Sequence, residues 1–117
     1  MPKQVTLPSR LVILSLANNK LISLEKTMFA KLVHLQALLL SRNKIRTIDT
    51  GTFRYNQFLQ VLDLSHNSLQ IVKFGVFSGL QNLKGLNLSF CDVSTIDLKS
   101  LDPLSNLKFL DFRANKI

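Results

Sequence analysis

A 24-residue repeat runs through most of this chain and decides what it can fold into. The period defines repeats 11–34, 35–58, 59–82 and 83–106 and a partial repeat 107–117. Three apolar columns recur without a slip: Leu11, Leu35, Leu59, Leu83 and Leu107; Leu14, Leu38, Leu62, Leu86 and Leu110; Leu16, Leu40, Leu64, Leu88 and Phe112. No single unit can bury these side chains alone, so we expect stacked repeats that share one continuous core.

Each repeat is expected to contribute one short strand. Leu14 and Leu16 flank Ser15, so the leucines point into the core while the serine points outward. Since one strand per repeat requires a return connection, successive strands should lie side by side and parallel. The return arm is expected to be a short helix, a 3-10 turn or coil, with the sheet on the concave side of a curved stack. One column of this arm predicts a buried aromatic row: Phe29, Phe53, Phe77 and Leu101.

A polar column follows the strands, and its members are Asn19, Asn43, Asn67, Cys91 and Asn115. The backbone turns inward here and leaves N–H and C=O groups without ladder partners. A buried amide both donates and accepts, so we predict that each asparagine satisfies the backbone of its own turn and of the next repeat. Cys91, the only cysteine, stands in this inward column. We therefore predict a buried, inert thiol whose pKa is raised.

The consensus LxxLxLxxNxLxxLxxxxFxxLxx over residues 11–117 resembles the leucine-rich repeat family. Its length and the phenylalanine at the nineteenth position are similar to the typical subclass of extracellular receptors and matrix proteins. The LxLSxN repeats, beside a less regular unit with Cys91 and Leu101, look like a fragment of a Toll-like receptor ectodomain. This resemblance implies an α/β leucine-rich repeat solenoid at the cell surface. It would bind a protein or microbial ligand and, as a further option, a second receptor chain.

Two alternatives stay open. A matrix or neuronal cell-adhesion protein uses the same repeat to bind protein partners or glycosaminoglycan, and an intracellular scaffold is a third class. Residues 1–10, which contain VTLPSR, look like the remnant of an N-terminal cap or of a preceding repeat. The last repeat stops just past Asn115, which would leave Leu107, Leu110, Phe112 and Ile117 open at one end. We therefore expect a fragment of a longer protein whose signal peptide and transmembrane helix lie elsewhere.

Outward strand positions supply the candidate binding residues. Leu39 interrupts a polar column, and Phe90 and Phe109 point outward by register. Such side chains serve as binding anchors, although single exposed apolar residues are also ordinary. The full candidate set is Leu39, Arg42, Asp63, His66, Asn87, Phe90, Phe109 and Asp111.

No catalytic or metal chemistry is predicted. Asp63 and His66 would need a nucleophile and an oriented pocket, and Ser65 fits the repeat as a structural residue. His34 and His66 do not converge with Cys91 or with a pair of carboxylates. We accordingly expect no enzyme activity, no metal and no cofactor.

The formal net charge of +8 makes a polyanionic partner an option. Lys20, Lys44 and Lys116 share one edge with Arg42 and Arg46, either as a polyanion site or as a solvated rim. No nucleic acid is expected, because most phenylalanines fall in the buried column rather than between basic residues.

No apolar run is long enough to cross a bilayer, so we expect no membrane contact by this segment. The sequence Asn87-Leu88-Ser89 is a glycosylation motif, which we weigh against a chance match in a repeat strand.

Overall fold

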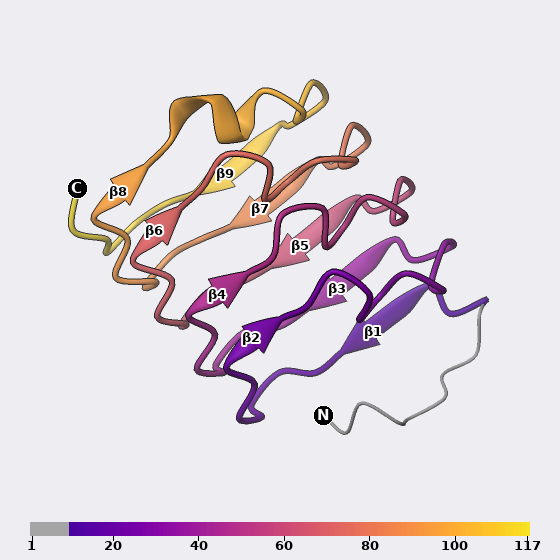
Figure 1. Ribbon diagram of the computed structural model, residues 1–117, viewed down its shortest axis with the longest axis horizontal. Coiled ribbons are helices and arrows are strands. Elements are labelled where there is room, and N and C mark those ends of the chain that lie inside the picture. Colours follow the sequence, from indigo (N-terminus) through magenta and orange to yellow (C-terminus); the bar gives the residue numbers. More distant parts are fainter. Residues whose placement is uncertain (1–9) are drawn as a thin grey trace.

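The computed structural model describes residues 10–117, so the predicted cap remnant lies, apart from Arg10, outside the described residues. The described chain winds as a parallel solenoid of about four turns, with the longer strands in one layer and the shorter strands in a second (Figure 1). The predicted leucine-rich repeat solenoid is confirmed. The elements in order are β1 (Ile13–Ser15), β2 (Ser23–Leu24), β3 (Ala37–Leu39), β4 (Thr47–Ile48), β5 (Val61–Asp63), β6 (Ile71–Val72), β7 (Gly85–Asn87), β8 (Thr95–Ile96), the 3-10 helix η1 (Leu98–Leu101) and β9 (Phe109–Asp111).

The main sheet contains five parallel strands in the order β1-β3-β5-β7-β9. Its register follows the repeat without a shift, so that Leu14 pairs with Leu38, Leu38 with Leu62, and Leu62 with Leu86. These leucines are buried, while their neighbours on each strand point to the other face. Residues 24 positions apart are therefore neighbours in space, about 4.8 Å apart along the stack.

The second layer consists of two-residue strands that the sequence did not predict. β2 pairs with β4, and β6 pairs with β8, both in parallel. The described residues show no ladder between β4 and β6, so this layer is divided between the second and third repeats.

The return arms are mostly turns. Leu32 N donates to Phe29 O at 3.0 Å and Leu35 N donates to Leu32 O at 3.2 Å, which are bonds between residues three apart. A few such bonds do not complete the costly nucleus of an α-helix. In the described chain the only helix is η1, whose N-cap Asp97 accepts from Lys99 N at 3.0 Å. Of the predicted forms of the return arm, turns and one 3-10 helix are observed. Among the described residues we find no helix with the length and apolar character of a membrane span.

The core is continuous from the first repeat to the fourth. Phe29, Phe53 and Phe77 are fully buried, and the first two rings stack with centroids 6.3 Å apart and planes inclined by 9°. Each such side chain contributes roughly 1.5–3 kcal/mol by leaving water. The predicted aromatic row is confirmed for these three, while Leu101 is only half-buried.

The last repeat has its core side chains open, as the sequence predicted. Leu110 is 45% exposed and Ile117 is 71% exposed, and Leu107 and Phe112 are half-buried. Their counterparts Leu86 and Leu88 in the fourth repeat are buried because a following repeat covers them.

Candidate functional site

The outer face of the main sheet, which we call the open face, carries an apolar row across all five strands. The register aligns Ile13, Ala37, Val61, Gly85 and Phe109. Ile13 is 62% exposed, Val61 44% and Phe109 73%, although each is apolar. Gly85 leaves a notch in the row, since a Cβ placed there would meet nothing within 4 Å. A contiguous apolar strip of this kind is a feature of binding surfaces rather than of a solvated sheet.

The polar side chains in the column beside this row make more hydrogen bonds within the protein than the sequence suggested. Asp63 Oδ1 accepts from Ser65 N at 2.9 Å and from Ser65 Oγ at 2.7 Å. Asn87 Oδ1 accepts in the same way from Ser89 at 3.0 and 2.7 Å. The strand serines are thus structural, as predicted. Asp63 and Asn87 spend part of their hydrogen-bonding capacity on their own turns.

Asp111 holds an arginine in a fixed pose at the end of this column. Its Oδ1 accepts from Arg113 Nε at 3.0 Å and its Oδ2 from Arg113 Nη2 at 2.8 Å. The guanidinium hydrogen bonds hold the pKa of Asp111 below its usual value, and the same contact raises the pKa of Arg113. A bidentate pair has defined geometry, so the exposed guanidinium presents an oriented plane. The sequence did not predict this pairing.

A column of left-handed residues lies just beyond the strands. Its members have φ between 56° and 60°: Asn18, Arg42, His66, Phe90 and Ala114. The sequence did not reveal it, because no glycine marks the turn. Non-glycine residues in this conformation cost about 1–2 kcal/mol each. His66 and Phe90 stack in this column, with ring centroids 4.5 Å apart and planes inclined by 6°.

The structure therefore separates the predicted binding residues into groups. Asp63, Asn87 and Asp111 align in one column beside the apolar row, as predicted, and Leu39 in that column is only half-buried. His66 and Phe90 share the left-handed column with Arg42. Among the described residues no hydrogen bond joins Asp63 to His66, and Asp63 Oδ1 accepts from Ser65 instead. Phe109 stands in the apolar row itself.

The asparagine column forms the predicted ladder, but in the opposite direction. Asn67 Oδ1 accepts from Ile45 N at 3.0 Å, and its Nδ2 donates to Leu40 O at 3.1 Å and to Leu64 O at 2.9 Å. Asn43, Asn67 and Asn115 each join their own turn to the preceding repeat, and the predicted link to the next repeat was wrong. The Asn67 amide reaches the preceding repeat because the carbonyl of Leu40, one residue past the end of β3, lies within hydrogen-bonding distance.

The family comparison agrees with this architecture. The family model described as leucine rich repeat matches residues 9–69 and 57–117, which together span nearly the whole chain. The chain belongs to the leucine-rich repeat family. Leucine-rich repeats generally mediate protein binding, and the solenoid is generally a non-enzymatic interaction fold. No curated protein sequence matches the chain significantly.

Two members of the leucine-rich repeat ladder depart from the predicted buried position. Asn19 is exposed, and its Nδ2 donates only within its own turn, to Leu16 O at 2.8 Å and Ala17 O at 3.2 Å. No earlier described repeat covers it. Asn115 is half-buried at the open end, although it keeps its bonds to the fourth repeat. The described ladder is therefore fully buried only at its interior positions, which are Asn43, Asn67 and Cys91.

Cys91 is fully buried in this leucine-rich repeat ladder, as predicted. Burial is the main reason that its pKa rises to about 11, and the negative charges of Asp63 and Asp92 act in the same direction. At neutral pH the thiol is protonated and enclosed, which makes it a structural group rather than a nucleophile.

The remaining charged residues do not assemble a metal site. In the described range no three His, Cys, Asp or Glu side chains are grouped to hold an ion. The lysine edge predicted for a polyanion is partly neutralised, since Lys116 Nζ lies 3.5 Å from Asp92 Oδ1. Lys20 and Lys44 on that edge are exposed.

Proposed function

We propose that this leucine-rich repeat chain is a ligand-binding segment of an extracellular, Toll-like-receptor-type ectodomain that holds a protein or microbial ligand on its open face. The apolar row from Ile13 to Phe109 carries this proposal, because it spans every strand of the main sheet. Its exposed apolar side chains would be costly to leave in water over a whole face. A partner that covers them gains affinity without any rearrangement of the sheet.

The charges on the two sides of the apolar row differ, so the open face is electrostatically asymmetric. On the strand-entry side Lys84 and Lys108 precede Gly85 and Phe109, and on the other side lies Asp111. A partner with an apolar stripe, acidic toward the lysines, matches this arrangement. Such complementarity fixes orientation and discourages wrong partners more than it adds affinity.

A glycan on Asn87 would compete with this proposal. Asn87 is half-buried on β7, and its Oδ1 is engaged by Ser89, while no described hydrogen bond uses its Nδ2, the atom to which a glycan attaches. Peptide mass spectrometry of the secreted chain decides whether the site is modified. A modified Asn87 would shift the contact toward the β1–β5 half of the face.

The binding experiment is a selection of peptides from a displayed random library against the immobilised chain, followed by a comparison of variants. Val61→Lys places a charge in the middle of the row and should weaken the selected binders about tenfold or more. Ile71→Lys is the matched control, because Ile71 is 51% exposed but lies in the second layer. Binders that lose affinity equally in both variants would contradict a site on the open face.

The adhesion-protein alternative uses the same surface and differs in what surrounds it. The sequence of the parent protein separates the two classes, since a Toll-type intracellular domain supports the receptor and immunoglobulin-like or cysteine-rich flanks support adhesion.

A further inference from the structure

Two hollows meet at one exposed aromatic ring on the edge where the chain enters the main strands, which we call the entry edge. Phe58 is 57% exposed and lines both hollows. The first, about 560 Å³, also contacts Arg10 and His34, and the second, about 410 Å³, contacts Lys84 and Lys108. The ring thus stands as a ridge between two basic depressions.

The charged side chains that line these hollows are all basic. Their lining contains cations, amides and apolar side chains but no carboxylate. Lys84 and Lys108 are exposed, and no ion pair engages either of them in the described part of the chain. They occupy equivalent positions in adjacent repeats, so their backbones lie about 4.8 Å apart. Two unpaired cations at this spacing suit a ligand that repeats its negative charge.

Amide side chains in the second hollow are already held in place. Asn82 Nδ2 donates to Gln57 O at 2.7 Å, and Asn106 Nδ2 donates to Gln81 O at 2.7 Å. Each bond spans one repeat and directs the amide oxygen away from the backbone that it joins. Two fixed acceptors, one repeat apart, can receive hydroxyl groups without first losing side-chain freedom.

From this combination we infer that the entry edge binds an anionic oligosaccharide. The apolar C–H face of one sugar ring packs on Phe58. Sulfate or carboxylate groups contact Lys84 and Lys108, and hydroxyls donate to the oxygens of Asn82 and Asn106. A polyanion without sugar rings would contact the lysines but would not pack on Phe58. This inference does not rest on the open-face proposal, because it depends on Phe58 and its two hollows rather than on the apolar row, although Lys84 and Lys108 border both surfaces.

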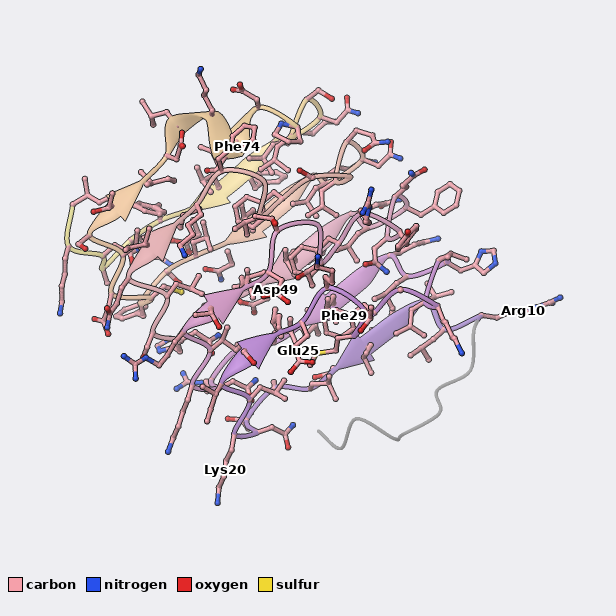
Figure 2. The ribbon with its side chains drawn as sticks, in the orientation of Figure 1. Arg10, Lys20, Glu25, Phe29, Asp49 and Phe74 are labelled. Atoms are coloured by element: carbon pink, nitrogen blue, oxygen red, sulfur yellow. The ribbon has the colours of Figure 1, made fainter. Side chains whose placement is uncertain are left out.

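The opposite edge is the natural comparison. Figure 2 shows Arg10 and Lys20 at opposite sides of the molecule, at the entry and exit ends of the first strand. The exit edge has Lys20 and Lys44, and the hollow beside Arg46 also contains Lys73 and no carboxylate, but its aromatic side chain, Phe77, is fully buried. Charge alone therefore predicts binding at both edges, whereas the saccharide inference predicts it at one.

The test is calorimetric titration of the chain with a sulfated heparin-derived hexasaccharide, its desulfated form, and a polyphosphate of matched charge. Phe58→Ala should weaken hexasaccharide binding about fivefold to tenfold, and Phe58→Tyr should retain it. Lys84→Ala and Lys108→Ala should each weaken it severalfold and reduce its salt dependence. Lys20→Ala, Lys44→Ala and Phe74→Ala are matched controls that should leave it unchanged. Circular dichroism melting verifies that these exposed substitutions preserve the fold.

Three results would overturn the inference. No measurable hexasaccharide binding would exclude the site. Equal losses on substituting Lys20 and Lys84 would show diffuse attraction to net charge. Polyphosphate binding as tight as the hexasaccharide, with Phe58→Ala harmless, would show a plain polyanion site. Val61→Lys should not weaken the saccharide, so failure here and failure on the open face are separate outcomes.

Discussion

The thiol of Cys91 donates to Leu64 O at 3.0 Å, in the place that the amide of Asn67 takes one repeat earlier with Leu40 O at 3.1 Å. Cysteine thus copies the donor half of the ladder asparagine. It cannot copy the acceptor half, because it lacks the amide oxygen. The next ladder asparagine does not fill this gap, since Asn115 Oδ1 accepts from Cys91 N and from the backbone two residues later.

The missing acceptor coincides with a local distortion. In the ladder the amide oxygen of Asn67 receives Ile45 N, but no described side chain receives the equivalent Leu69 N. Directly afterwards Gln70 has φ of 63°, and Ile71 N donates to Leu69 O at 2.6 Å in a γ-turn. A cavity of about 210 Å³ opens here, where the ladder between β4 and β6 is interrupted. We attribute the distortion to the cysteine.

Cys91→Asn should stabilise the chain by about 1 kcal/mol, because the new oxygen can accept from Leu69 N. Chemical denaturation measures the change in unfolding free energy, and hydrogen exchange reports whether the Leu69 amide gains protection. Cys91→Ala is the control, since it removes the donor without adding an acceptor and should destabilise. Unchanged exchange at Leu69 in Cys91→Asn would show that the cysteine does not cause the distortion.

Asn67→Ala should destabilise by roughly 1–3 kcal/mol, because it leaves buried backbone groups of two repeats unpaired. Asn19→Ala should cost less than about 0.5 kcal/mol, since Asn19 is exposed and water can replace its bonds. The pair isolates the effect of burial at one position of the repeat. Equal unfolding free energies for the two variants would contradict the ladder as a source of stability.

Cys91 should also impose an alkaline limit on stability. The pKa of its thiol is about 11 in the folded chain, against an ordinary value of 9.0. The folded state therefore holds the proton more tightly, and its stabilisation, full below pH 9, is lost as pH rises toward 11. The expected loss is roughly 2–3 kcal/mol, since one pKa unit corresponds to about 1.4 kcal/mol. Denaturation at a series of pH values checks it, with Cys91→Ala as the reference that removes this component while other groups titrate unchanged.

Thiol labelling tests the burial of the Cys91 side chain independently. Folded wild-type protein at neutral pH should react with a thiol reagent far more slowly than denatured protein, because the thiol is buried and protonated. Labelling of the native chain at the denatured rate would place Cys91 outside the core.

The repeat predicted the parallel sheet, its register and the buried columns because each depends on apolar spacing, which the sequence displays directly. The second-layer strands escaped prediction, since two-residue strands leave no alternating pattern. The left-handed column was also hidden, because Arg42, Phe90 and Ala114 are not residues that favour positive φ. The burial of Asn56 was likewise not predicted from the sequence. Asn56 replaces a leucine of its column, yet it is buried and its Nδ2 donates to Phe29 O at 3.0 Å.

Among the candidate site residues, sequence register placed the aligned polar column correctly but could not show how its members are engaged. The bidentate contact between Asp111 and Arg113 and the stack of His66 on Phe90 depend on side-chain rotamers. The two hollows beside Phe58 draw their lining from all four full repeats and the partial fifth, which no local motif encodes.

Two glycines predict opposite responses to the same substitution. Gly79 has φ of 94°, and a Cβ there would lie 2.7 Å from Arg54 Cα, so Gly79→Ala forces the backbone of the neighbouring repeat to move. We expect a loss of roughly 1–3 kcal/mol. Gly85 lies in strand β7 with open space above it, so Gly85→Ala should be neutral or slightly stabilising. Thermal and chemical denaturation compare the two, and a destabilised Gly85→Ala would mean that the notch in the apolar row is needed by the fold rather than left for a partner.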